Sequence, residues 1–146
     1  VFIGEPHDEL LRQLLGILHL WGVRRAAVDA TGLGEPLARF LASALGGDVV
    51  IPYRFTAESK SRLGYELLAA VNGGRLKMYA QDGSPQYRDF WQEMERARAD
   101  YRPNRAMNFF VPPAEGHDDY LMSLALTVAA ARDARPRIAR GRVREV

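Results

Sequence analysis

The chain of 146 residues contains no cysteine, which excludes disulfide bonds and thiolate metal ligands and fits a reducing compartment. No apolar run reaches the ~18 residues that a membrane-spanning helix needs, and no signal peptide is visible, so we expect no membrane partner. The chain also lacks a Gly-x-x-x-x-Gly-Lys phosphate-binding loop, which excludes an ATPase of that type within this sequence.

What is present is the composition of one ordinary globular domain, with 47% hydrophobic and 26% charged residues. The net charge of +2 is unevenly spread. Residues 132–146 carry six arginines against two acids, a charge of +4, which leaves −2 for residues 1–131. We therefore separate a domain, 1–131, from an Arg-rich tail, 132–146. The tail has two interpretations, a contact for nucleic acid or an acidic partner, and a solvated disordered end.

Apolar periodicity and turn residues predict an α/β domain in which a parallel strand pair is joined by a helix. The opening residues 1–3 look like the end of a strand, so we expect a fragment of a longer chain that lacks its first strands. The expected elements, in order, are helix 7–21, strand 25–29, helix 35–45, strand 48–53 (buried on both faces), helix 57–72, edge strand 75–79, helix 84–98, hairpin 101–111, linker 112–116 and helix 117–132.

Asp29 stands where the first apolar strand ends, directly before a glycine turn and a helix. This is how α/β folds place a carboxylate at the carboxyl edge of a parallel sheet. Two interpretations are open at this stage. Asp29 is a catalytic or metal-binding acid, or it is a turn residue whose side chain accepts from the amides of Thr31 or Gly32.

A second acidic site opens the last helix, at His117, Asp118 and Asp119. Acids at a helix start commonly cap free amides and complement the helix dipole. Two adjacent acids are more than capping requires, however. If they converge with Asp29, their oxygens suit Mg²⁺ or Mn²⁺, and two such ions would activate a water for phosphodiester hydrolysis.

Three segments then carry a resemblance: Val-Asp-Ala-Thr-Gly-Leu-Gly at 28–34, Phe-Thr-Ala-Glu-Ser-Lys at 55–60, and Gly-His-Asp-Asp-Tyr-Leu-Met-Ser-Leu-Ala-Leu at 116–126. In order and spacing they resemble the nuclease domain of phage terminase large subunits, the DNA-packaging motors. The resemblance implies a ribonuclease H-like mixed sheet with flanking helices, and a two-metal endonuclease that cuts concatemeric viral double-stranded DNA during packaging.

The resemblance also implies residue roles. Asp29 matches the second acid of the family's triad, and the His-x-Asp pattern favours Asp119 over Asp118 as the third. His117 matches the family's histidine, as a ligand, a proton relay or a helix-start residue. The first acid of the triad has no counterpart here; Glu5 and Asp8 are poor substitutes.

Further partners follow from the resemblance alone. They are an ATPase domain in the same longer chain, the small terminase subunit and the portal protein, in the cytoplasm of a host bacterium.

Weaker candidates for DNA contact are Lys60, Arg102 and Arg105, for which a solvated cation is the alternative. The aromatic residues Tyr101, Phe109 and Phe110 of the hairpin either touch DNA or pack on the core. Two other functions also remain open. One is another ribonuclease H-like DNA enzyme, such as a transposase, integrase or junction resolvase. The other is a non-catalytic module that binds DNA or a partner through its tail.

Overall fold

A computed structural model describes residues 7–32 and 34–132 of the chain. The fold is mixed α/β, with two small sheets and five helices in this part of the chain. The elements are α1 (His7–Leu20), β1 (Ala26–Asp29), α2 (Gly34–Leu45), β2 (Val50–Tyr53), α3 (Ala57–Asn72), α4 (Pro85–Arg96), β3 (Arg98–Tyr101), β4 (Met107–Phe110) and α5 (Asp119–Ala131). None of the helices that it describes is both long enough and apolar enough to cross a bilayer.

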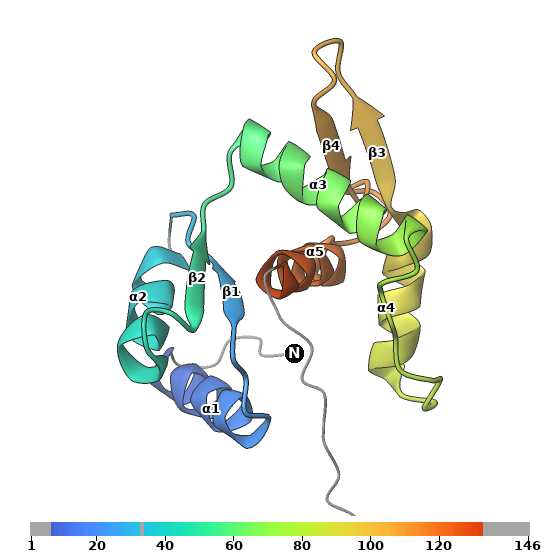
Figure 1. Cartoon of the computed structure of the whole chain (residues 1–146). Helices are drawn as coiled ribbons and strands as arrows, with labels where there is room; N and C mark the ends of the chain where they lie inside the picture. The colour runs from blue at the N-terminus through green and yellow to red at the C-terminus, as the bar shows by residue number, and fades with distance from the viewer. Residues whose placement is uncertain (1–6, 33, 133–146) are drawn as a thin grey trace, which may run out of the picture.

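The predicted strand–helix–strand unit is confirmed. β1 and β2 pair in parallel, with Ala26 opposite Val50 and Asp29 opposite Tyr53, and α2 connects them. α2 lies on one side of this sheet and α5 on the other (Figure 1). The carboxyl end of β1 therefore faces the region where α5 and α3 approach the sheet.

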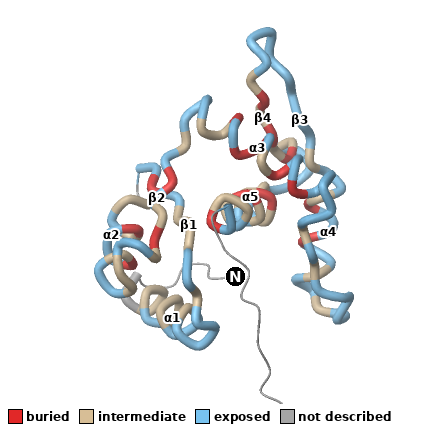
Figure 2. The backbone as a smooth tube through the Cα atoms, viewed as in Figure 1, coloured by how far each residue is buried: buried red, intermediate tan, exposed pale blue. Residues whose placement is uncertain are grey.

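Helix α5 is the centre of the molecule, with α3 and α4 packed around it (Figure 1). Buried residues concentrate where α3, β4 and α5 meet, whereas α1 has no buried residue among those described (Figure 2). The core cluster joins residues from four elements and the segment after β4: Tyr53, Leu63, Leu67, Phe109, Val111, Leu121 and Ala125. Because α5 packs on both β1 and α3, this core fixes the start of α5 relative to the end of β1.

Helix starts follow the sequence signals. Ser84 caps α4 by accepting the Tyr87 amide at 3.1 Å, with Pro85 in the first helical position. At α3, Thr56 and Ser59 form a reciprocal capping box. The hairpin of β3 and β4 is also confirmed, although β3 begins at Arg98, where we expected α4 to continue.

Three predictions about the fold are wrong in whole or in part. Residues 75–79 form no strand; Leu76 and Met78 instead line an apolar groove beside α3 and α4. β2 is buried on both faces only in part: Val50 and Tyr53, which point to opposite faces, are buried, but Pro52 is exposed. The helical spacing of Leu63, Leu67, Leu68 and Val71 predicts that all four face inward, but Leu68 and Val71 are exposed and line the same groove.

The expectations for residues 1–6, and for the tail beyond Arg132, lie outside the described residues. Arg132 itself forms an ion pair with Glu66 of α3, with nitrogen and oxygen 2.7 Å apart.

Candidate functional site

Asp29 is the last residue of β1, and its side chain is exposed. Its Oδ1 accepts the amide of Thr31 at 2.8 Å, so the turn interpretation is confirmed for one carboxylate oxygen. In the part of the chain that the structure describes, Oδ2 has no hydrogen bond or ion pair. The turn thus fixes the carboxylate and leaves one oxygen for a ligand.

The turn after Asp29 is held by contacts that depend on small residues. Gly32 adopts φ +56°, a left-handed conformation that glycine reaches without strain. A Cβ on Gly34 would collide with the backbone carbonyl oxygen of Asp29, so only glycine permits this approach of α2 to β1. Thr31 Oγ1 accepts the Phe55 amide at 3.0 Å and links the ends of the two strands. Asp29 is therefore carried by a rigid sheet edge.

Asp118 occupies the N-cap position of α5, but its side chain makes no capping hydrogen bond. The free amide of Leu121 is instead satisfied by Glu93 of α4, whose Oε1 accepts it at 2.7 Å. Capping is therefore the wrong explanation for Asp118. Asp119, in the first turn, still lies where a negative charge complements the helix dipole.

The predicted acids come together in one cavity. Asp29, Asp118 and Asp119 all line a hollow of about 460 Å³, so the end of β1 and the start of α5 face each other. Lys60, from the first turns of α3, lines the same hollow, and its Nζ lies 5.5 Å from the centre of the Phe109 ring. Apolar side chains and one serine complete the wall: Phe55, Met122, Ser123 and Leu126.

The donor chemistry of this cavity suits a hard cation, since Asp118, Asp119 and one oxygen of Asp29 have carboxylate oxygens without a hydrogen bond to any described residue. The acidic side chains of the cavity lie farther apart than in a metal site whose ligands all come from the protein. Within residues 7–32 and 34–132, no three His, Asp or Glu side chains are grouped closely enough to hold one ion together. These residues fit an open site, in which water or phosphate supplies the remaining ligands.

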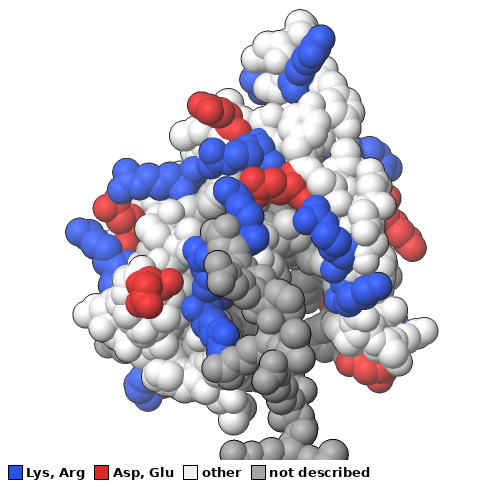
Figure 3. Space-filling model, in the orientation of Figure 1, with Lys and Arg blue, Asp and Glu red and all other residues white. Residues whose placement is uncertain are grey.

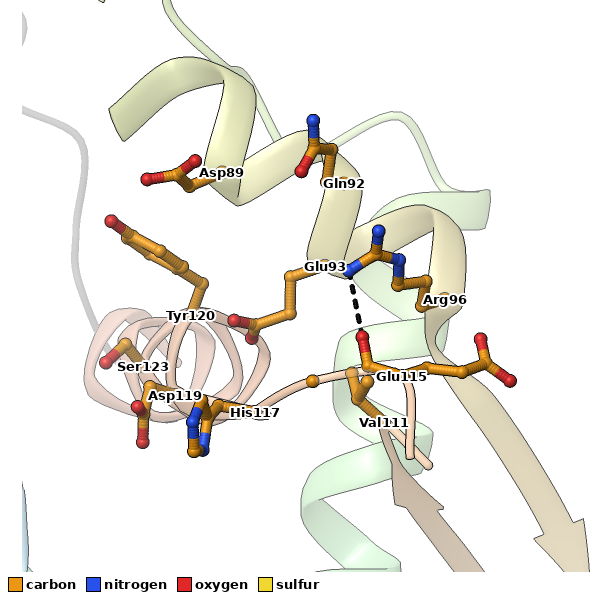
Figure 4. Close-up of a pocket in the computed structure, with 11 residues that line it drawn as sticks. Asp89, Gln92, Glu93, Arg96, Val111, Glu115, His117, Asp119, Tyr120 and Ser123 are labelled. Carbon is orange, nitrogen blue, oxygen red and sulfur yellow. Dashed lines mark hydrogen bonds between the residues drawn. The ribbon is translucent and has the colours of Figure 1, made fainter. Parts of the chain in front are cut away.

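His117 lies outside this cavity. It is exposed and lines a neighbouring hollow of about 440 Å³ between α4 and the start of α5, which Asp119 also borders. Figure 4 shows this second hollow, with Glu93 reaching from α4 towards α5 and the Asp119 carboxylate pointing away from it. Arg96 closes one end by donating to the Glu115 carbonyl at 2.8 Å.

Glu93 is the residue of this region that sequence reasoning missed. It is only 9% exposed, and burial raises the pKa of its carboxyl above the usual value; the hydrogen bond from the Leu121 amide lowers it, and the nearby charges of Asp119 and Asp118 raise it. A signal was available: Glu93 follows Phe90 by three positions, so an acid interrupts the apolar face of its helix.

The three basic candidates for DNA contact lie in two different places. Lys60 borders the acidic cavity, whereas Arg102 and Arg105 lie at the tip of the hairpin, away from it. Figure 3 shows basic side chains at the hairpin tip and over the start of α3 on the viewed face. The Arg105 carbonyl accepts the Tyr65 hydroxyl at 2.8 Å, which ties the tip to α3.

The hairpin aromatic residues also divide. Phe109 is buried, so core packing is confirmed there, whereas Tyr101 is 60% exposed.

The fold and the cavity define a mixed α/β domain with an acidic hollow at the carboxyl edge of a parallel strand pair. In comparisons with known proteins, no family model, curated protein or solved structure matches the chain.

Proposed function

We propose that this chain is a metal-dependent endonuclease domain of ribonuclease H-like architecture, and that it cuts viral double-stranded DNA as part of a terminase large subunit. One observation carries the proposal: acids far apart in sequence, Asp29 and the pair Asp118 and Asp119, line a single cavity. A chain in which these acids served only as local turn and cap residues would have no reason to bring them to one hollow.

In this proposal Asp29 and Asp119 hold the divalent ions, and Asp118 supports them. The Thr31 amide fixes Asp29 Oδ1, so that the carboxylate presents its other oxygen to the cavity in one orientation. Bound Mg²⁺ or Mn²⁺ would supply an activated water and charge stabilisation for phosphodiester hydrolysis. Lys60 would neutralise a phosphate oxygen of the DNA at the rim. His117, which faces the neighbouring hollow, would act only at the edge of the site.

Partners and location belong to the same proposal. The substrate is duplex DNA, an ATPase domain belongs to the same longer chain, the small terminase subunit and the portal protein are its partners, and the site of action is the host cytoplasm. The acids lie in an exposed hollow, which a duplex backbone can reach.

The test is a calorimetric titration with Mn²⁺, together with nicking of supercoiled plasmid. Asp29→Asn is the sharpest variant, because an amide oxygen still accepts the Thr31 amide while the charge is lost. We expect Asp29→Asn and Asp119→Asn each to weaken Mn²⁺ binding at least ~10-fold, the loss of about 1.4 kcal/mol, and to abolish Mn²⁺-dependent nicking.

The matched control is Asp100→Asn, which removes an exposed acid from β3 and lies outside the cavity. It should bind Mn²⁺ as the unsubstituted chain does. Unchanged Mn²⁺ binding and nicking in Asp29→Asn would overturn the proposal. If the unsubstituted chain itself shows no saturable Mn²⁺ binding, a non-catalytic DNA- or partner-binding module becomes the better account.

A further inference from the structure

The start of α5 is capped by a residue of another helix, Glu93 of α4. An N-cap aspartate normally accepts the amide of the second or third helical residue. Asp118 is of the right type, but its backbone (φ −116°, ψ 25°) is not extended like that of Thr56 and Ser84, which cap α3 and α4. The third helical amide, that of Leu121, is taken by Glu93 of α4 instead. Two carboxylates thus lie beside one helix start, and only the distant one is used as the cap.

Capping by Glu93 has a desolvation cost that capping by Asp118 would avoid. Glu93 is 9% exposed, whereas Asp118 is half-buried at the rim of a cavity, so the helix is capped by the less solvated of the two acids. The arrangement leaves the Asp118 side chain without a capping bond and with its place in the wall of the acidic cavity.

We propose that Glu93 is a positioning residue of the acidic cavity: by accepting the Leu121 amide it allows Asp118 to keep a backbone conformation that does not cap the helix, with the Asp118 side chain in the cavity wall for a ligand. The capping exchange stands on the geometry alone, and its consequence for cation binding rests on the proposed function. Figure 4 shows Glu93 reaching from α4 towards the first turn of α5, with the neighbouring Asp119 directed away from it.

Loss of Glu93 should therefore change what Asp118 does. In Glu93→Ala the Leu121 amide has no acceptor from α4, and Asp118 can accept it by changing its backbone to the extended conformation of the other two N-caps. The helix start is then capped locally, and the cavity loses one of its three carboxylates. Glu93→Gln keeps an acceptor oxygen on a side chain of the same length, so Asp118 should stay where it is.

The first arm of the test needs no metal. Thermal unfolding is measured for Asp118→Ala alone and in the Glu93→Ala background. Asp118→Ala alone should leave Tm nearly unchanged, because Asp118 caps nothing. In the Glu93→Ala background the same substitution should lower Tm by roughly 2–6 °C, because Asp118 has become the cap. Equal effects of Asp118→Ala in both backgrounds would overturn the capping exchange.

The second arm measures Mn²⁺ affinity by calorimetry in the same folded variants. We expect Glu93→Ala to weaken Mn²⁺ binding about as much as Asp118→Ala does, the two to be non-additive in combination, and Glu93→Gln to bind as the unsubstituted chain. A merely structural Glu93 would lower Tm and leave the Mn²⁺ affinity unchanged. Glu95→Ala, an exposed acid on the same helix, is the control and should change neither quantity.

The two arms separate the possible failures. If the unsubstituted chain binds no Mn²⁺ but Asp118→Ala is destabilising only without Glu93, the proposed nuclease function fails and the capping exchange stands. If Mn²⁺ binds and Glu93→Ala leaves its affinity intact, the positioning role is wrong and the nuclease site remains.

Discussion

Gly64 brings α3 close to the hairpin, and this approach predicts how two glycine-to-alanine substitutions should differ. A Cβ on Gly64 would lie 2.6 Å from Met107 Cε and 2.7 Å from Phe109 Cδ1, whereas ordinary contacts begin at 3.4 Å. Met107 Cε is the end of a flexible side chain and can move into the apolar groove that both residues border, whereas the Phe109 ring, 5% exposed, can yield only by shifting as a whole. Gly64→Ala should therefore overpack the junction of α3 and β4.

Two opposing effects set the change in the free energy of unfolding that Gly64→Ala causes. Overpacking a well-filled core costs about 1–3 kcal/mol. Replacing glycine by alanine inside a helix contributes about 1 kcal/mol in the other direction. A Cβ on Gly16, within α1, would meet nothing within 4 Å, so Gly16→Ala measures the glycine-to-alanine effect in a helix without overpacking. Gly16→Ala should raise the free energy of unfolding by about 1 kcal/mol. The free energy of unfolding of Gly64→Ala should be lower than that of Gly16→Ala by about 1–3 kcal/mol.

Equilibrium unfolding in urea measures both variants against the unsubstituted chain. The midpoints should move in opposite directions, or Gly64→Ala should stay near zero, while the m-value stays constant, because the surface exposed on unfolding is the same. If Gly64→Ala stabilises the chain as much as Gly16→Ala does, α3 does not pack on β4 as closely as the described contacts require.

Further predictions concern Glu93, Ser61 and the acidic cavity. The pKa of Glu93 is raised above the usual 4.5, so the folded state binds the Glu93 proton more tightly than the unfolded state does. The stability of the unsubstituted chain relative to Glu93→Gln should therefore fall as pH rises from 4.5 through the raised pKa. Tm measured for both from pH 4 to 8 checks this, and a relative stability that rises with pH would contradict it. Ser61→Ala should lower the free energy of unfolding by about 1–3 kcal/mol in urea, because Ser61 Oγ accepts the buried Met107 amide at 2.9 Å; no loss would mean that another acceptor replaces it. Mn²⁺ at 100 times its dissociation constant should stabilise the chain by about 2.7 kcal/mol, EDTA should reverse this, and an equal Tm rise in Asp119→Asn would place the ion elsewhere.

Local sequence chemistry was sufficient to predict most of the elements. Ser84 and Pro85 mark the start of α4, and Gly22, with φ +56°, follows the last residues of α1. These signals act within one helical turn, so they survive without knowledge of the tertiary fold. The convergence of Asp29 and Asp119 was expected from the family resemblance and not from spacing, because α5 follows a hairpin that belongs to the other sheet.

The errors come from interactions between distant segments. Leu76 and Met78 alternate as in a strand, but their side chains enter the groove beside α3 and α4. Periodicity describes which side chains are apolar and carries no information on which backbone partner is available. The same limit applies to Glu93, whose acceptor role spans 28 positions between α4 and α5.

The use of Glu93 rather than Asp118 bears on whether the acidic cavity has a function. If the only requirement at the start of α5 were a satisfied amide, Asp118 could meet it locally, with a contribution of about 1 kcal/mol and no buried charge. Instead the amide is satisfied by a buried acid whose charged form is disfavoured by burial and by the neighbouring Asp119 and Asp118. The less favourable cap is explained if the Asp118 carboxylate is required in the wall of the cavity, beside Asp119, for the cation of the proposed function.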